Sequence, residues 1–189
     1  MKAIGAVNAL YPTPTTIVGC TVNGKPNFLT IAHIGILNHG TPQYLSIGLG
    51  KVHYSNAGIM ENKTFSICLP SEDLMVKTDY CGLMTGKKTD KAALFHIFYG
   101  ELKTAPLIRD CPLSIECKLV EMVESGPNEI FIGEIKGTYT EERFLTDGKL
   151  DFRKMKPLIL SQPDTSYWRL GEQVARAWNI GKKYKAKLK

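Results

Sequence analysis

Short runs of apolar and β-branched residues alternate with turn residues in the first part of the chain, which predicts a β-hairpin and a third strand. Residues 15–22 are rich in Thr, Ile and Val. The dipeptide that follows them, Asn23-Gly24, is preferred in two-residue hairpin turns. Residues 28–32 read as the returning strand and residues 44–49 as the next strand.

The pattern continues with many strands and few helices. A short helix is expected from Ser55 to about Asn62, and a second over residues 74–80 that Gly82 ends. Strands are expected over 64–69, 114–120 and 130–135, the last two joined by a turn. We therefore predict a mainly β fold, a closed or nearly closed barrel in which few strand edges stay exposed.

The segment 50–59 carries the first candidate for function. Lys51 and His53 lead into Ser55 at the expected start of a helix, where unpaired N–H groups and a partial positive charge favour an anion. We expect the Ser55 hydroxyl to cap this helix and the three residues to hold a phosphate monoester. Taken singly, Lys51 is also typical of a solvated strand end and Ser55 of an ordinary helix cap.

Six motifs, in order, resemble the flavin reductase-like, FMN-binding split-barrel family, and within it the flavoredoxin branch. They are YPTP at 11–14, NFLTIAH at 27–33, KVHYS at 51–55, CGLMTGKKTDK at 81–91, FIGEI at 131–135 and YWRLGE at 167–172. Each motif is short, but together they cover nearly the whole chain in the family's order.

This resemblance implies a Greek-key-like split barrel that binds FMN. The residues that it assigns to the cofactor are Asn27, Thr30, Ile31, Ala32, His33, Lys51, His53, Ser55 and Lys91. Of these, residues 51–55 would serve the phosphate, and Lys91 matches a family lysine that reaches the cofactor. The backbone N–H groups of residues 30–33 would be directed at the ribityl and ring oxygens.

The resemblance also implies the chemistry, which is hydride transfer from NADH or NADPH to FMN without a catalytic side chain. The sequence has no Gly-x-Gly-x-x-Gly motif, so the nicotinamide would dock against the flavin itself. The alternative is a flavoredoxin-type electron carrier that passes electrons between redox proteins without nicotinamide turnover. A flavin-binding protein with no redox partner is a third, weaker reading.

Relatives of this family are generally homodimers, which implies a dimer here. Residues 167–170 and 174–180 supply aromatic and apolar side chains for such a contact. The competing interpretation is that Trp168 and Trp178 complete the core of the monomer.

Three positions depart from the family pattern. His33 stands where close relatives often have tryptophan, and His53 replaces a commoner arginine or lysine, so a neutral His53 would weaken the phosphate site. Asn128 falls where many relatives have a histidine, and an amide cannot shuttle protons near neutral pH. We expect Lys87 and Lys88 to lie in a mobile, solvated loop, because neighbouring like charges repel, and Asp90 to pair with Lys91.

Composition narrows the class of protein. The 189 residues suit a single domain, 1–189, with a basic tail at about 181–189, and the net charge is +6. The tail has one candidate stacking ring, Tyr184, and no nucleic-acid module is recognisable, so we expect no nucleic-acid binding. No stretch approaches the roughly 20 apolar residues of a membrane span and no signal peptide is evident, which predicts a cytoplasmic protein without membrane attachment.

The five cysteines are odd in number and lack a C-x-x-C pair, which argues against a disulfide framework and a metal site. Cys20, Cys68 and Cys117 fall in apolar strand patterns, where a thiol acts as a small hydrophobe. Cys81 is expected in a polar loop and is the one candidate for reactivity, although an inert thiol is the favoured reading.

Overall fold

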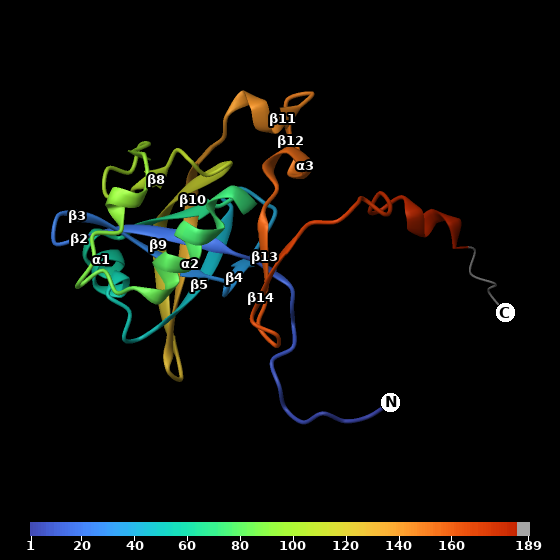
Figure 1. Ribbon diagram of the computed structural model, residues 1–189, viewed down its shortest axis with the longest axis horizontal. Coiled ribbons are helices and arrows are strands. Elements are labelled where there is room, and N and C mark those ends of the chain that lie inside the picture. The colour runs from blue at the N-terminus through green and yellow to red at the C-terminus, as the bar shows by residue number, and fades with distance from the viewer. Residues whose placement is uncertain (185–189) are drawn as a thin grey trace.

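A computed structural model describes residues 1–184, and its main element is a seven-stranded antiparallel sheet (Figure 1). The strand order is β3-β2-β6-β9-β10-β5-β4. The bounds are β2 Thr16–Val22, β3 Lys25–Ile31, β4 Ile34–Ile36, β5 Tyr44–Gly50, β6 Thr64–Leu69, β9 Leu113–Ser125 and β10 Asn128–Tyr139.

The predicted hairpin is confirmed, and its turn explains the register. Val22 on β2 lies opposite Lys25 on β3, with Asn23 and Gly24 between them. Both turn residues have positive φ, 51° and 73°, which is the backbone of a turn that matches the twist of the flanking strands. The strands predicted over 44–49, 64–69, 114–120 and 130–135 are likewise present as β5, β6, β9 and β10, the last two longer than expected.

The sheet curls into a nearly closed barrel because one stretch of chain supplies both of its edges. β3 pairs with β2, and β4, which begins three residues after β3 ends, pairs with β5 on the opposite edge. Residues Ala32 and His33 make the bend between them. The mainly β barrel predicted from the sequence is therefore confirmed.

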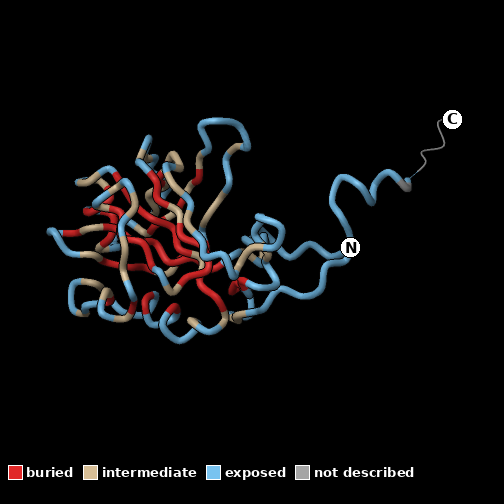
Figure 2. The backbone as a smooth tube through the Cα atoms, turned by 90° about the horizontal axis from the view of Figure 1, so that it is seen from above, coloured by how far each residue is buried: buried red, intermediate tan, exposed pale blue. Residues whose placement is uncertain are grey.

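The barrel interior is filled by alternating side chains of these strands. On β5, for example, Leu45, Ile47 and Leu49 are buried and the residues between them are only half-buried. Figure 2 shows the buried positions concentrated in the barrel. The members of this core are Val18, Cys20, Val22, Leu29, Ile31, Leu45, Ile47, Leu49, Ile59, Phe65, Ile67, Cys117 and Phe131.

A second apolar cluster lies on the outer face of β2 and β3, beneath the helix α2 (Met75–Leu83) and the 3₁₀ turn η2 (Ala92–Leu94). It contains Ile17, Phe28, Cys68, Cys81, Phe95, Ile108 and Cys111. β2 is therefore buried on both faces, which explains its nearly continuous apolar sequence.

Two expectations about α2 are wrong. Gly82 does not end the helix, which continues to Leu83, because packing of α2 on β3 outweighs the roughly 1 kcal/mol cost of a helical glycine. Cys81 lies in this helix and not in a polar loop, and its side chain is fully buried. Burial raises the pKa of the Cys81 thiol to about 11, against a smaller opposing effect of the Lys91 charge.

The remaining elements are short. The first helix is α1 (Ser55–Asn62), as predicted. A three-stranded sheet consists of β1 (Thr13–Pro14), β13 (Leu158–Ser161) and β14 (Ser166–Arg169). Two strand pairs are formed by β7 (Ile97–Phe98) with β8 (Leu107–Ile108) and by β11 (Leu145–Thr146) with β12 (Lys149–Leu150). The other helical pieces are α3 Phe152–Met155 and the 3₁₀ turns η1 Glu72–Leu74, η3 Glu142–Phe144 and η4 Ile180–Lys183. No helix within residues 1–184 combines the length and apolarity needed to span a bilayer.

Both terminal segments leave the barrel beside β13 and β14 and extend away from it (Figure 1). Trp168 is 56 % and Trp178 95 % exposed, so the expectation that they complete the monomer core is wrong. The first part of the predicted basic tail, residues 181–184, belongs to this C-terminal segment, and the rest lies outside the described residues.

A buried carboxylate ties the strand β9 to the loop beside it. Glu116 is fully buried and accepts hydrogen bonds from Tyr139 Oη at 2.6 Å, Glu101 N at 3.0 Å and Leu102 N at 2.9 Å. Gly100 leaves room for this carboxylate, because a Cβ there would lie 2.6 Å from Glu116 Oε1. The contact is structural and lies outside the site described below.

We predict that Glu116→Ala lowers the free energy of unfolding by about 3 kcal/mol, because three partly buried donors lose their buried acceptor. Denaturant unfolding followed by circular dichroism measures the change. The control is Glu121→Ala, an exposed position on the same strand, where a loss under about 0.5 kcal/mol is expected. Equal losses in the two variants would contradict the role given to Glu116.

All five cysteines are buried in the described structure, and the thiolate is the reactive form, so the native protein should resist thiol labelling at about pH 8. Because the pKa of Cys81 is raised, its labelling rate should increase with pH toward about 11. Mass spectrometry after treatment with a disulfide reagent, with and without denaturant, tests this. If Cys81 in the native protein were labelled as fast as free cysteine, the prediction would be wrong.

Candidate functional site

A cavity of about 260 Å³ opens between the amino end of α1 and the carboxyl end of α2, over the strand β3. We call it the site cavity. Its lining residues are Asn27, Leu29, 52–55, 82–86 and Lys91. It thus brings together Asn27, His53, Ser55 and Lys91, four of the residues assigned from the sequence, from three separate stretches of chain.

Asn27 and Ser55 form a buried polar pair in this cavity. The Asn27 amide nitrogen donates to Ser55 Oγ at 2.8 Å, and the side chains are only 6 % and 2 % exposed. The expectation that Ser55 caps α1 is wrong, because Tyr54 occupies the N-cap position and no side chain bonds to the free N–H groups there. The Ser55 hydroxyl instead joins α1 to β3.

Lys91 is the cation of the site cavity. It is 3 % exposed, and its Nζ donates to Cys81 O at 3.0 Å and Met84 O at 2.9 Å, at the carboxyl end of α2. The negative end of a helix dipole stabilises a cation in this position, while burial lowers the pKa of the Lys91 ammonium. Because an ammonium has three donors, one remains beyond these two bonds.

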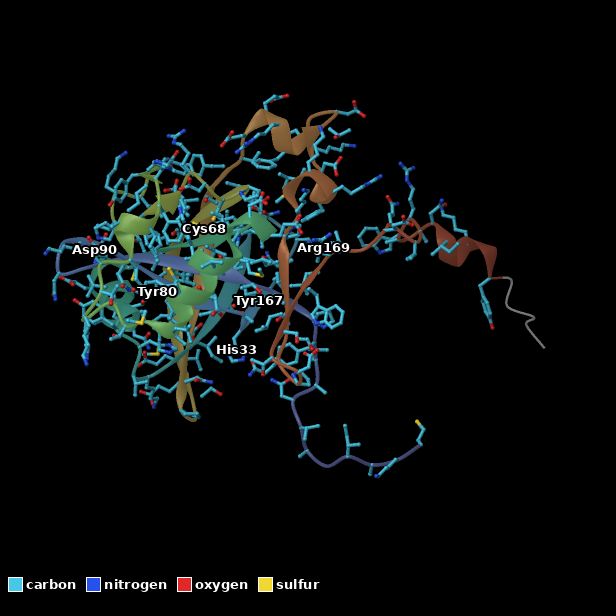
Figure 3. All side chains as sticks on the ribbon, in the orientation of Figure 1. His33, Cys68, Tyr80, Asp90, Tyr167 and Arg169 are labelled. Carbon is cyan, nitrogen blue, oxygen red and sulfur yellow. The ribbon has the colours of Figure 1, made fainter. Side chains whose placement is uncertain are left out.

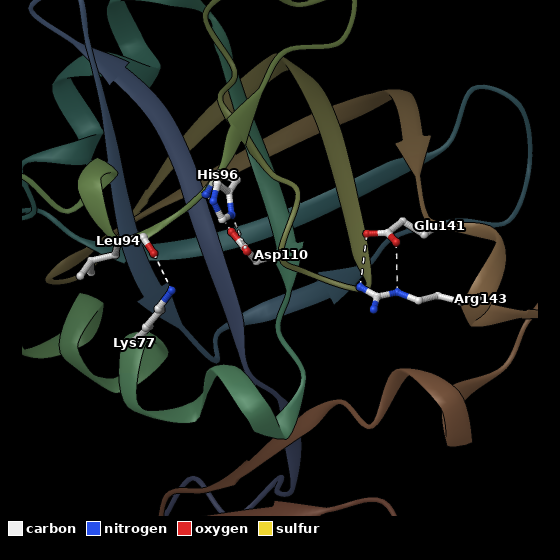
Figure 4. A network of polar contacts seen from close by, with 6 residues as sticks. All are labelled: Lys77, Leu94, His96, Asp110, Glu141 and Arg143. Carbon is white, nitrogen blue, oxygen red and sulfur yellow. Dashed lines mark hydrogen bonds and ion pairs between the residues drawn. The ribbon is translucent and has the colours of Figure 1, made fainter.

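The loop that carries Lys91 is held to α2 at its carboxyl end. Lys77 Nζ on α2 donates to Leu94 O at 2.7 Å, as Figure 4 shows. The expected pairing of Asp90 with Lys91 is wrong, since Asp90 Oδ1 accepts a hydrogen bond from Ala92 N at 3.0 Å. The carboxylate therefore bonds to the backbone at the first residue of η2, and the Lys91 ammonium bonds to the helix carbonyls.

His53 lines the cavity next to Lys91. Burial and, to a smaller extent, the Lys91 charge lower the pKa of His53 below its ordinary value of 6.5, so the ring is mainly neutral at pH 7. The turn that bears it is anchored by Asn56, whose amide nitrogen donates to Gly50 O at 3.1 Å and Glu129 Oε2 at 2.6 Å. His53 offers a hydrogen bond to a ligand here and little charge.

Lys51 does not line the site cavity. Its side chain is exposed, and its Nζ lies 2.5 Å from Glu124 Oε2 on the β9–β10 hairpin. Its backbone N–H donates to Pro127 O in the same hairpin. The structure thus pairs Lys51 with a carboxylate instead of joining it to His53 and Ser55.

Residues 30–33 lie along β3 and the bend after it, outside the lining of the site cavity. The Thr30 hydroxyl donates to Thr78 O on α2, Ile31 and Ala32 are buried, and His33 is exposed. In the view of Figure 3, His33 lies well apart from Asp90. β3 is an edge strand, so some of its backbone groups face away from β2.

The sequence interpretation missed the residues of the α2 end and the loop after it. Leu83 and Met84 form an apolar part of the wall, and Gly86 makes a close approach to Asn27. A Cβ on Gly86 would lie 1.9 Å from Asn27 Oδ1, so only glycine fits the present arrangement. In the sequence, Gly82 and Gly86 lie four residues apart in the same segment as Lys91, and this pair was the signal that could have indicated a close backbone approach.

A second depression of about 410 Å³ adjoins the site cavity and shares Asn27, Tyr54 and Gly86 with it. We call it the lysine groove. Its other lining residues are Val22, Asn23, Lys25, Pro26 and 87–90. Asn23 on the hairpin turn donates to Tyr54 Oη at 3.2 Å, which fixes the ring between the two depressions.

Comparison with known proteins agrees with this architecture. The sequence profile described as "Flavin reductase like domain" matches residues 8–160. The chain is similar to the crystal structure of a flavoredoxin from Methanosarcina acetivorans, with 44 % identity, 97 % of each chain covered and a TM-score of 0.92. A flavoredoxin of Desulfovibrio vulgaris (Miyazaki F) shows 33 % identity over 96 % of this chain and 99 % of that one, with a TM-score of 0.88.

The same fold extends to more distant proteins. An FMN-binding protein from Thermus thermophilus is 18 % identical, with 93 % of this chain and 96 % of that chain covered and a TM-score of 0.78. At that identity the likeness concerns the fold alone. The match of the family profile over most of the sequence decides the assignment: the chain belongs to the flavin reductase-like domain family and has its split-barrel fold.

Proposed function

We propose that this protein binds FMN in the site cavity and works as an electron-transfer protein of the flavoredoxin kind. The observation that carries the proposal is the nearly buried Lys91 ammonium, held at the cavity beside the Asn27 and Ser55 pair. A buried cation with an uncommitted donor, facing polar groups from two other elements, is typical of a site for an anionic ligand.

The donor set fits the chemistry of this cofactor. FMN has an anionic end, a hydroxylated chain and a flat, largely apolar ring with polar edges. The cavity offers an ammonium, an amide, a hydroxyl and a neutral imidazole on one part of its wall, and Leu29, Leu83 and Met84 on another.

In this proposal the residues of the chain bind FMN and orient it. Lys91 supplies positive charge, and the positive end of the α1 dipole lies at the same cavity. The Asn27 and Ser55 pair donates and accepts hydrogen bonds along the ligand. When bound, the flavin supplies the redox chemistry.

Two parts of the sequence-based site remain predictions. The backbone N–H groups of residues 30–33 are proposed to face the flavin ring, which the edge position of β3 supports. A phosphate role for Lys51 requires that the ligand replace Glu124 as its partner, because the structure pairs the two side chains. We therefore rank Lys51 below Lys91 among the groups that hold the anionic end.

The electron-carrier function is favoured over NAD(P)H-dependent flavin reduction by one observation. The likeness to a flavoredoxin covers 97 % of this chain at 44 % identity. Reduction of FMN by NADH or NADPH is the second candidate, because the matching family profile is that of flavin reductase-like domains. In both cases we propose a homodimer, which the exposure of Trp168 and Trp178 supports.

We predict that Lys91→Met weakens FMN binding by about tenfold or more, because a charge-assisted contact with the ligand is lost. Asn27→Ala should weaken binding less, by several-fold, since a neutral hydrogen-bonding group is removed. Titration of the apoprotein with FMN, followed by quenching of flavin fluorescence, gives the dissociation constants.

The control is Lys149→Met, an exposed lysine on β12 outside both depressions, which should leave the FMN affinity unchanged. Circular dichroism of each variant establishes that the fold is intact. Wild-type affinity in a folded Lys91→Met protein would refute the proposed role of this lysine.

The electron source is predicted to be a redox protein. FMN-loaded protein should be reduced within seconds by a reduced ferredoxin, while NADH and NADPH cause little bleaching of the flavin absorbance over minutes. Anaerobic absorbance spectroscopy with each donor in turn measures both reactions. Sustained oxidation of NADH or NADPH over multiple turnovers would contradict the electron-carrier function and would support NAD(P)H-dependent flavin reduction.

A further inference from the structure

We propose that the lysine groove and the apolar residues at the mouth of the site cavity form the docking surface for a small acidic redox protein. This inference rests on the proposed function, because it names the chemistry of the partner that reaches the same site. Its first element is a group of three basic side chains, Lys25 beside the hairpin turn and Lys87 and Lys88 on the loop before Lys91.

These three side chains are exposed and, within the part of the chain that the structure describes, have no acidic partner in an ion pair. Within residues 1–184, the ion pairs of the structure involve other cations, for example Lys51 with Glu124 and Lys156 with Glu72. The one carboxylate in the groove, Asp90, accepts a hydrogen bond from the backbone of Ala92. The groove therefore presents a local excess of positive charge, in a chain whose net charge is +6.

The loop that presents two of these lysines has a defined turn. The backbone N–H groups of Lys88 and Thr89 donate to Thr85 O at 3.1 and 3.2 Å. Lys87 and Lys88 are exposed, which confirms that they are solvated, while the expected mobility of their loop stays a prediction. This turn presents both lysines beside the site cavity.

The second element is apolar surface at the mouth of that cavity. Val52 is 88 % and Leu83 75 % exposed, and both line the cavity, as does Met84. Apolar side chains in the centre with basic side chains at the edge match the anatomy of a transient protein interface. Such a surface excludes water over the contact, while the charges steer an oppositely charged partner.

An acidic protein suits this surface better than the other occupants. A small anion would be held by covered ammonium groups, whereas the three lysines are exposed. A second copy of this chain would bring identical lysines to a symmetric contact, which like-charge repulsion disfavours. The complementary partner has carboxylates around an exposed redox centre.

The test measures binding directly. Oxidised acidic [2Fe–2S] ferredoxin is titrated into the FMN-loaded full chain by isothermal calorimetry, at low and at physiological ionic strength. We expect binding that weakens as salt is added, and a loss of about tenfold or more at low salt in the variant Lys87→Glu with Lys88→Glu.

A matched variant removes the effect of net charge. Lys118→Glu with Lys149→Glu reverses two exposed lysines on β9 and β12, outside the groove, and changes the total charge by the same amount. It should bind the ferredoxin within about twofold of wild type. An equal loss in both variants would show that only the overall charge matters and would overturn the proposal.

Two further readouts separate the alternatives. FMN affinity of the Lys87→Glu, Lys88→Glu variant should match wild type, and a parallel loss would assign these lysines to the cofactor phosphate and overturn the docking role. Sedimentation of that variant should show an unchanged oligomer, and a changed one would assign the surface to a second copy. Because FMN titration and ferredoxin binding are measured separately, failure to bind FMN is distinguished from failure to bind the ferredoxin.

Discussion

Closure of the barrel by residues 25–36 is the constraint on which the rest of the structure depends. β3 pairs with β2 and β4 pairs with β5, so one bent stretch of chain joins the two edges of the sheet. The alternation of side chains along β3 then places Asn27 and Leu29 on the same face, with Leu29 in the core and Asn27 against α1. A polar residue is thereby buried at the margin of an apolar barrel, where only a partner such as Ser55 can satisfy it.

The second requirement of the site is a buried positive charge, and the barrel strands do not supply it. Lys91 reaches the cavity from the loop after α2, and the carbonyl oxygens at the end of that helix hold its ammonium. The apolar cluster beneath α2 and η2 fixes the position of the helix on β2 and β3. Stability of that cluster and geometry of the cation are therefore linked through Cys81, a member of the cluster whose carbonyl oxygen accepts a hydrogen bond from Lys91.

Much of the site could be predicted, but the contacts of its residues could not. Asn27, His53, Ser55 and Lys91 were assigned by motif order and do meet in one cavity. The partner of Ser55 is an amide 28 residues away, and that of Lys51 is a carboxylate 73 residues away. Local sequence rules predict a helix cap at Ser55 and a solvated cation at Lys51, because such rules consider only residues that are close in sequence. Gly86 and the α2 end were missed for the same reason.

The sequence by itself determined the β-rich class, the hairpin at Asn23-Gly24, the helix after β5 and the long β9–β10 pair, since each follows from local turn chemistry and from the period of apolar residues. Tertiary structure decided which strands become neighbours, where α2 ends, that Cys81 is buried and that Trp168 and Trp178 lie outside the core. These outcomes depend on packing between distant segments, whose free energy exceeds the local preferences of single residues.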